Sequence, residues 1–203
     1  RYQKTTASLA RFFSERAFIE YRIKMESEYL RALAREVQLK GLKFKSLKVN
    51  AEEIKKTEQT TNHDFKAIEY WMKSKLKTEW VHFGLTSQDA TNIAYALMIT
   101  DALKQVIIPA LDKILDVLTK LARLYNRAAL LSRTHGQPAS PTTFGKEMAV
   151  FIERLNRQFN QLKAWRESNP DAPDGLWYKD FGSFKICGEG KYPKTFLLAG
   201  QAA

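Results

Sequence analysis

TSQDATNIAYALMITDALKQVIIPALDKILDVLTKLARLYNR, residues 86–127, is a very long segment with the periodicity of a helix. Apolar side chains recur there every three or four residues, which is the spacing of one helix face. The later part of this apolar stripe contains Ile107, Leu111, Ile114, Leu118, Leu121 and Tyr125. Pro109 interrupts the pattern, and a proline inside a helix kinks or breaks it. We therefore predict a long helix with a kink or a break at Pro109.

Other segments show the same periodicity. Residues 8–37, SLARFFSERAFIEYRIKMESEYLRALAREV, are predicted to form two helices that are broken near Ser14. A shorter helix is predicted from about Phe65 to Lys77, and a looser region from Gly41 to Val49 precedes it. A further helix is predicted from Pro141 to about Trp165. Its stripe contains Phe144, Met148, Phe151, Leu155, Phe159 and Leu162.

These patterns predict an all-α fold, because no segment shows sustained strand alternation. Long apolar stripes need partner helices, which indicates an elongated helical bundle and favours self-association. We predict an N-terminal helical domain over residues 1–80 and the start of a central bundle over residues 81–165. Residues 166–203 form a divergent tail that holds five of the nine glycines and three of the six prolines.

The composition restricts the cellular setting. Cys187 is the single cysteine, so no disulfide can form within the chain and no pair is present for a cysteine zinc site. A reducing, cytoplasmic location is expected. No run of about 18 apolar residues and no apolar N-terminal signal is present, so neither membrane insertion nor secretion is expected. The chain begins at Arg1 without a methionine, so we expect that either processing or, as the favoured interpretation, truncation has removed a preceding segment.

The formal net charge is +11, and such an excess of lysine and arginine is typical of nucleic-acid binding. The favoured interpretation is different. Basic residues such as Lys73, Lys75 and Lys77 lie on predicted solvated helix faces, mixed with acidic residues, and no nucleic-acid-binding module surrounds them. The same positive field would attract a small anionic substrate.

RTHGQPASPTTFGKE, residues 133–147, surrounds a histidine with residues that restrict the backbone. Gly136 permits conformations closed to other residues, and Ser140 with Pro141 is typical of a helix N-cap and first helical position. His135 is thus predicted to lie in a fixed loop just before a helix. It could simply bond a neighbouring carbonyl group, or it could act as an acid or a base, the commonest catalytic role of a positioned histidine.

Two other stretches also place small polar residues at a predicted helix start. TTNHD, residues 60–64, and LTSQD, residues 85–89, each contain a Thr-x-x-Asp spacing. Such a spacing is typical of a capping box. The free N–H groups of a helix start also attract a carboxylate or a phosphate, so both stretches are candidate anion sites.

These motifs carry a resemblance to a known family. RTHGQPASPTTFGKE, TTNHDFKAIEYW, HFGLTSQDATN and the opening RYQKTTASLARFFSERAFIEYR resemble the adenylosuccinate lyase family of the fumarase and aspartase superfamily. The resemblance covers about residues 1–164, with the motifs in the family's order. It implies a β-elimination that splits fumarate from adenylosuccinate to give AMP, and from SAICAR to give AICAR, in purine synthesis. It also implies that no metal or organic cofactor is required.

The resemblance assigns roles to single residues. By its position in the motif, His135 resembles the general acid that protonates the departing nitrogen. Arg1 and Tyr2 match a pair that contacts the nucleotide. Asn62, His63 and Asp64 match a substrate-binding turn, in which His63 also assists catalysis.

Thr86 and Ser87 match a pair of hydroxyl groups that holds substrate. His82 is a weaker candidate, and a packing role at a helix end is at least as well supported by the sequence. The family forms a homotetramer whose active site draws on three subunits, so the resemblance implies such an assembly.

Two departures from the family pattern bear on activity. The family's base is a serine within a Ser-Ser-x-Met-Pro-x-Lys-x-Asn pattern, which this chain lacks, and the tail after residue 164 does not follow the family. We therefore expect a fragment of the lyase that is inactive alone. The alternatives are a truncated paralogue, a non-catalytic helical assembly protein, and a basic nucleic-acid binder.

Overall fold

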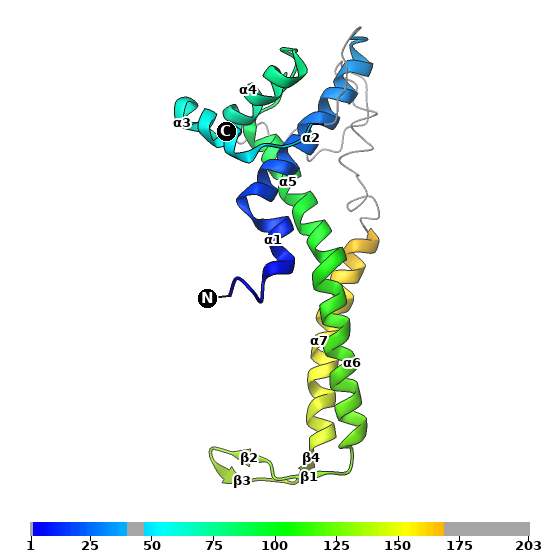
Figure 1. Ribbon diagram of the computed structural model, residues 1–203. Helices are drawn as coiled ribbons and strands as arrows, with labels where there is room; N and C mark the ends of the chain where they lie inside the picture. Colours follow the sequence, from blue (N-terminus) through cyan, green and yellow to red (C-terminus); the bar gives the residue numbers. More distant parts are fainter. Residues whose placement is uncertain (1, 40–46, 169–203) are drawn as a thin grey trace. The chain divides into compact units, whose positions relative to one another are not determined.

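The computed structural model describes residues 2–39 and 47–168, and these residues are mainly helical, as predicted (Figure 1). They form two compact units, one ending at Ala102 and the other starting at Leu103. The predicted domain limits at residues 80 and 165 stay a prediction. Nearly all of the predicted tail lies outside the described residues.

The first unit begins with two helices, α1 (Ala7–Phe13) and α2 (Glu15–Glu36), which meet at Ser14. Ser14 has an extended backbone, and its hydroxyl group accepts a hydrogen bond from the Ala17 N–H at 3.1 Å. A serine in this role caps the start of a helix. The predicted break near Ser14 is therefore confirmed.

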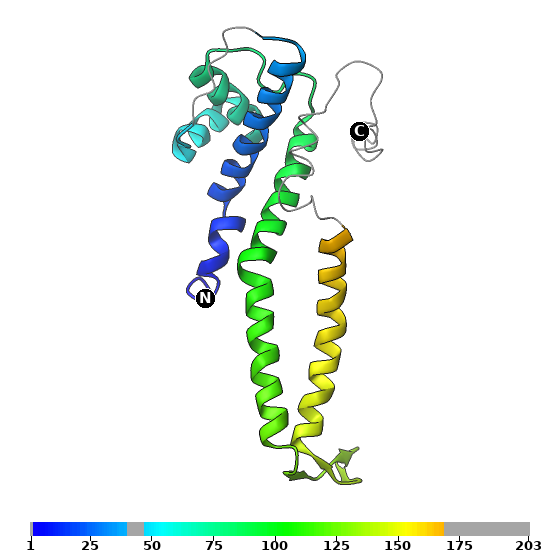
Figure 2. The ribbon, with the colours of Figure 1, turned by 90° about the vertical axis from the view of Figure 1, so that its right-hand side faces the viewer.

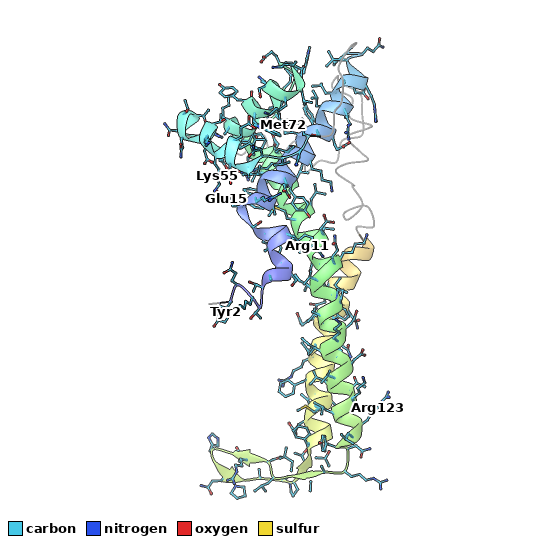
Figure 3. All side chains as sticks on the ribbon, viewed as in Figure 1. Tyr2, Arg11, Glu15, Lys55, Met72 and Arg123 are labelled. Carbon is cyan, nitrogen blue, oxygen red and sulfur yellow. The ribbon has the colours of Figure 1, made fainter. Side chains whose placement is uncertain are left out.

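Two further helices, α3 (Ala51–Thr61) and α4 (Asp64–Leu76), follow. Helix α4 matches the prediction, and its Phe65, Ile68 and Met72 are almost fully buried. Helix α3 was not predicted, and Ile54 is its one buried residue. An ion pair between Lys55 and Glu15 ties α3 to the start of α2 (Figure 3).

Helix α2 contributes to both apolar clusters of the first unit. On one side it packs with α3 and α4, and on the other with α5 (Ser87–Ala102). The first cluster contains Ile19, Ile23, Leu30, Ile54, Ala67, Ile68, Trp71, Met72 and Val81. The second contains Met25, Tyr29, Ala32, Leu33, Phe65, Ala90, Ile93 and Leu97. Helix α2 is therefore the central element of this unit.

Beyond α5 the helix changes its geometry before Pro109. Residues Leu103–Ile107 form a π-helical turn, and α6 (Ile108–Leu124) follows, with Pro109 in its first turn. A proline is tolerated there because the first N–H groups of a helix have no partner within it. The helix is not broken at Pro109, and its irregularity is a π-helical turn at Leu103–Ile107, just before the proline.

Helical residues run without interruption from Ser87 to Leu124, and an 18-residue window in this run has a mean hydropathy of 1.4. It is the one run among residues 2–39 and 47–168 that is long and apolar enough to cross a membrane. A core helix of a soluble protein can have the same length and composition, and 33% of the window is buried within the structure. The expected absence of a membrane segment stays a prediction.

In the second unit, α6 packs along α7 (Phe144–Ser168) (Figures 1 and 2). Four two-residue strands connect the two helices. Strand β1 (Ala129–Leu130) pairs with β4 (Thr142–Thr143), and β2 (Arg133–Thr134) pairs with β3 (Gln137–Pro138). Strands this short leave no periodic pattern for a sequence to display.

The start of α7 differs from the prediction. The helix begins at Phe144, not at Pro141, and the Thr143 hydroxyl group, not Ser140, accepts a hydrogen bond from the Lys146 N–H at 3.2 Å. The next residue, Gly145, packs directly against the end of α6. A Cβ atom on Gly145 would lie 2.4 Å from the carbonyl oxygen of Ala122, so a side chain does not fit there.

Helix α6 has no buried residue in this structure, although its sequence is strongly amphipathic. Its apolar residues Ile114 and Val117 are 48% and 54% exposed, and Phe151 of α7 is 50% exposed. Ile114 and Val117 lie one turn apart on the same side of α6, and exposed apolar side chains that gather in this way are typical of an interaction surface. We call Ile114, Val117 and Phe151 the apolar face of the second unit.

Candidate functional site

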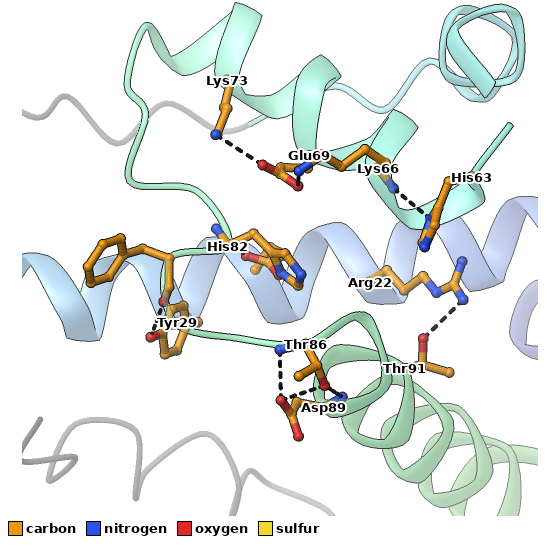
Figure 4. Close-up of polar contacts among 12 residues, drawn as sticks. Arg22, Tyr29, His63, Lys66, Glu69, Lys73, His82, Thr86, Asp89 and Thr91 are labelled. Carbon is orange, nitrogen blue, oxygen red and sulfur yellow. Dashed lines mark hydrogen bonds and ion pairs between the residues drawn. The ribbon is translucent and has the colours of Figure 1, made fainter. Parts of the chain in front are cut away.

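The candidate residues fall in both units. Asn62, His63 and Asp64 form the turn between α3 and α4, and Thr86 and Ser87 lie at the start of α5, all in the first unit. His135 lies in the second unit. Figure 4 shows the polar contacts of the first unit around α2.

Asn62 and His63 each complete a helix end. Asn62 adopts a left-handed backbone with φ of 50° and donates its N–H to the Glu58 carbonyl oxygen at 2.8 Å, which ends α3. His63 is the N-cap of α4, and its Nδ1 accepts a hydrogen bond from the Lys66 N–H at 3.2 Å (Figure 4). Nδ1 therefore carries no proton, so a neutral His63 ring holds its proton on Nε2. The His63 side chain is half-exposed, and none of the contacts among the described residues uses its Nε2 atom, so an Nε2–H group could donate to a ligand.

The predicted capping box from Thr61 to Asp64 is wrong. Thr61 is the last residue of α3, and its hydroxyl group contacts the His63 carbonyl oxygen at 3.1 Å. His63 takes the capping position in its place. The sequence pattern misled because imidazole Nδ1 can accept the same backbone hydrogen bond as a hydroxyl group.

Asp64 is bound by a buried arginine of α2. Arg22 donates from one terminal nitrogen to Asp64 Oδ2 at 2.6 Å and from the other to the Thr91 hydroxyl group at 3.0 Å. Its guanidinium group also stacks over the Phe18 ring at 3.7 Å. Burial alone would raise the pKa of Asp64, but the hydrogen bond and the charge of Arg22 hold that pKa below its usual value. Asp64 is therefore a fixed carboxylate.

The second predicted capping box, from Thr86 to Asp89, is present at the start of α5. The Thr86 N–H and hydroxyl groups both donate to Asp89 Oδ2 at 2.8 Å, and the Asp89 N–H donates back to the Thr86 hydroxyl oxygen at 3.2 Å. The Thr86 side chain thus has a structural role. The Ser87 hydroxyl group has no hydrogen-bond partner within the described ranges, so it remains available to a ligand.

His82, the weaker candidate, lies in the loop between α4 and α5, not at a helix end. Its Nδ1 lies 2.6 Å from Glu26 Oε1, and its backbone N–H donates to Glu26 Oε2 at 3.2 Å. Its ring packs 4.6 Å from the Phe65 ring, so the predicted packing role is correct in part. Glu26 itself is fully buried.

Tyr29 supports the same loop from α2. Its hydroxyl group donates to the Phe83 carbonyl oxygen at 2.6 Å. Burial, followed by the carboxylates of Glu26 and Asp89, raises the pKa of Tyr29 to about 12. Tyr29 is therefore a neutral hydrogen-bond donor that helps to hold the loop in place.

His135 occupies the tip of the hairpin formed by β2 and β3. It has a φ of 49° and Gly136 has a φ of 81°. Positive φ at both central residues defines the tight two-residue turn that matches the twist of paired strands. Arg133 donates to the Gly136 carbonyl oxygen at 3.2 Å and supports the turn. His135 is thus held by a hairpin, not by a helix start as predicted, and its side chain is exposed.

The two remaining candidates lie at the N-terminus. Arg1 is outside the described residues, and Tyr2 has an exposed side chain (Figure 3). Metal binding was not expected, and the described residues contain no group of three or more His, Cys, Asp or Glu side chains that could hold an ion.

Sequence reasoning missed the buried charges Arg22 and Glu26. They lie four residues apart on α2, and each is bonded to the loop or turn that carries a candidate histidine. Their burial could have been predicted from the sequence, because both residues lie on the helix face that Ile19 and Ile23 share. Charged residues on an apolar helix face need partners.

The residues 1–173 match the model of a lyase family, and the chain belongs to this family. Its relatives include an adenylosuccinate lyase of Dictyostelium discoideum, 42% identical over 188 residues, and one of Haemophilus influenzae, 40% identical over 185 residues. Each alignment covers 80% of this chain and 40% or 41% of the relative. The chain thus spans about two fifths of the length of these relatives.

Solved structures confirm the fold. A fumarate lyase from Mesorhizobium sp. BNC1 aligns with a TM-score of 0.69 and 22% identity, covering 78% of this chain and 39% of that one. A 3-carboxy-cis,cis-muconate lactonizing enzyme from Pseudomonas putida aligns with a TM-score of 0.69 and 20% identity, covering 87% and 45%. The chain therefore shares the mainly helical fold of these two enzymes over the aligned part.

Proposed function

We propose that this chain is part of an adenylosuccinate lyase, which releases fumarate from adenylosuccinate to give AMP and from SAICAR to give AICAR. The observation that carries the proposal is the 42% identity to an enzyme of that name over 188 residues. That alignment covers 80% of this chain. The turns before α4 and α5 add two helix starts whose N–H groups suit the anionic groups of such substrates.

In the proposed reaction a base removes a proton from the carbon beside a carboxylate. The C–N bond then breaks, a C=C bond forms, and an acid delivers a proton to the departing nitrogen. His135 is the proposed acid, because its imidazole is exposed and its backbone is fixed by a tight turn. A fixed backbone limits the loss of entropy when the donor meets the nitrogen.

His63 has a different proposed role. Because its Nδ1 accepts the Lys66 N–H, a second ring proton would break the helix cap. Nε2–H hydrogen bonding to a substrate oxygen therefore fits the contacts better than proton transfer does. Ser87, with its unused hydroxyl group at the start of α5, is proposed to bind a substrate anion.

The remaining binding roles rest on the resemblance. Tyr2, Asn62, Asp64 and Thr86 are proposed to line the substrate site, together with Arg1. Asn62, Asp64 and Thr86 would act mainly by shaping the turns, since their groups are engaged in contacts within the chain.

We also propose that the chain assembles with copies of itself, as a homotetramer, in the cytoplasm. The apolar face of the second unit supports self-association. The base would come from a part of the lyase that this chain does not contain. No nucleic acid or membrane partner is proposed.

A non-catalytic assembly protein is the second candidate. The Thr86–Asp89 capping box supports it, because this interaction accounts for the Thr86 side chain without any substrate.

A mixing experiment separates the two candidates. The chain is combined with the Haemophilus influenzae relative in which the histidine aligned with His135 is replaced by alanine, and the release of fumarate from adenylosuccinate is followed. Activity is expected to appear on mixing, because an assembly could join an intact His135 to an intact base. The matched control is the chain with His135→Ala. Co-assembly without any gain in activity would contradict the lyase proposal and favour the assembly protein.

A further inference from the structure

Glu26 is a fully buried carboxylate whose two oxygens both contact one residue. Oε1 lies 2.6 Å from His82 Nδ1, and Oε2 accepts the His82 backbone N–H at 3.2 Å. Within the described part of the chain, the His82 ring is the one side chain that forms an ion pair or a hydrogen bond with Glu26. A buried carboxylate without such partners would be strongly destabilising, so this pair fixes both groups.

The contact determines where the His82 ring carries its proton. An ionised carboxylate only accepts hydrogen bonds, so the Nδ1 atom at 2.6 Å must be a donor. A neutral His82 ring then has no proton on Nε2. Exchange to the other tautomer would place two acceptors against each other in a buried site.

His63 has the opposite arrangement. Its Nδ1 accepts the Lys66 N–H, so its neutral ring carries the proton on Nε2. The two histidines of the first unit thus present opposite hydrogen-bonding character, with a donor at His63 Nε2 and an acceptor at His82 Nε2.

The same carboxylate also restrains the backbone. His82 has a φ of 62°, a left-handed conformation that is unfavourable for a residue other than glycine. The Leu85 N–H donates to the His82 carbonyl oxygen at 3.4 Å, and Thr86 and Ser87 follow directly. The bond from the His82 N–H to Glu26 therefore holds the segment that leads into α5.

We propose that Glu26 is a positioning residue of the substrate site: it fixes the ring of His82 with the proton on Nδ1 and fixes the segment that presents Thr86 and Ser87. This inference rests on the proposed lyase function for its consequence. The tautomer and the restraint of the loop can be measured without any catalytic activity.

Proton–nitrogen correlation spectra of the imidazole rings test the first half. The chain has three histidines, so replacement of each in turn assigns the signals. At a pH about two units above the ordinary imidazole pKa of about 6.5, His82 is expected to have a protonated Nδ1 and His63 a protonated Nε2. A proton on His82 Nε2 with none on Nδ1 would place the proton of the pair on Glu26 and would overturn the proposal.

Two variants test the role of the carboxylate. Glu26→Gln keeps the shape and removes the charge, while Glu26→Asp keeps the charge and withdraws it by one methylene group. In both variants, His82 is no longer expected to carry its ring proton on Nδ1 alone. Hydrogen exchange of the amides of residues 82–87 is expected to become faster by about tenfold or more. Glu20→Gln, on the exposed side of the same helix, is the matched control and should change neither. An unchanged His82 pattern in folded Glu26→Gln would overturn the proposal.

The His63 signal serves as an internal control for folding. If Glu26→Gln also loses the protonated Nε2 signal of His63, the variant has unfolded. The test of the proposal then rests on Glu26→Asp, the more conservative variant. In the mixed lyase assay, Glu26→Asp is expected to raise KM at least tenfold with a smaller loss in kcat. If the unmodified mixture releases no fumarate while the tautomer results hold, the lyase function fails and the arrangement of Glu26 and His82 stands. An unaltered KM in an active mixture would remove the positioning role.

Discussion

The guanidinium group of Arg22 and the carboxylate of Asp64 meet at 2.6 Å, although the first side chain is 7% exposed and the second 51%. The buried guanidinium group of Arg22 on α2 thus fixes Asp64, the first residue of α4, through a contact within the protein. The turn at residues 62–64 owes its position to a residue that is itself almost inaccessible to a ligand.

Replacement of Arg22 by alanine should lower the free energy of unfolding by about 2–3 kcal/mol. The variant loses the hydrogen bonds to Asp64 and Thr91 and the stacking on Phe18, but the half-exposed Asp64 can regain water, so the loss is smaller than for a fully buried pair. Urea denaturation of the chain measures it. Arg16→Ala, at an exposed ion pair with Glu20, should cost less than about 1 kcal/mol; equal losses would contradict the prediction.

The two hydroxyl groups at the start of α5 should behave differently. Thr86→Ala is expected to cost about 1 kcal/mol of stability because it removes the helix cap, whereas Ser87→Ala should stay within about 0.5 kcal/mol. Both should weaken adenylosuccinate binding in the mixed lyase. Thermal melting and calorimetric titration measure the two effects. If Thr86→Ala lowers the melting temperature and leaves affinity unchanged, its role is capping alone.

Most helices could be predicted from the sequence because their signals are local. Ser14 separates two periodic segments, and Phe65, Ile68 and Met72 mark the buried face of α4. Helix α3 could not be predicted from periodicity, because its single buried residue, Ile54, does not make an apolar stripe. The start of α7 was placed too early because Pro141 is equally suited to the extended segment before β4.

From the sequence, only those members of the site that stand beside turn residues were predictable. His63, His82 and His135 are visible as histidines near turn residues, but the partners that orient them are distant in sequence. Glu26 and His82 are 56 positions apart, and Arg22 and Asp64 are 42 apart. Periodicity identifies a buried face without showing which charges meet across it. Only the folded chain brings these pairs together.

Glu69 should make stability depend on pH in the acid range. Burial acts to raise the pKa of this carboxyl group, but Lys66 and Lys73 outweigh burial and lower the pKa. The folded state therefore binds a proton less readily than the unfolded chain. The resulting stabilisation is complete above the unfolded value of about 4.3, and it is lost as the pH falls through the lower folded value.

The test compares Glu69→Gln with the unmodified chain by denaturation between about pH 7 and pH 3. The variant should be less stable at pH 7, and the gap should narrow as the pH falls below about 4.3. Glu52→Gln, at an exposed carboxylate at the start of α3, is the control. A gap that is constant over the whole pH range would show that Glu69 does not act through its charge.

His135→Asn should remove activity and keep the hairpin. Asparagine readily adopts the left-handed backbone that this turn requires, and it cannot deliver a proton as imidazolium does. Turnover in the mixed lyase should fall by about 10² to 10⁴, the usual contribution of a general acid, without a change in melting temperature. Gln137→Ala in the adjacent strand should retain activity. Near-normal turnover in His135→Asn would exclude His135 as the acid.

The apolar face of the second unit should drive assembly. Val117→Lys places a charge one helical turn from Ile114 and should shift the chain toward smaller species in sedimentation velocity. Asp116→Lys introduces the same side chain at the neighbouring exposed position of α6 and should leave the distribution largely unchanged. A chain that is monomeric before any substitution would contradict the role of this face.

Substitution of Gly145 is expected to disrupt the second unit, although this residue has no role in the proposed reaction. Its backbone packs against Ala122 and Asn126 so closely that a Cβ atom would approach them within 2.4–2.6 Å, and its N–H donates to the Tyr125 carbonyl oxygen at 3.0 Å. Every single-base change that alters a glycine codon introduces a Cβ atom or a stop. Any such mutation would push the base of α7 away from α6 and displace the strands that carry His135. Natural variants that destabilise the second unit are thus expected at this glycine.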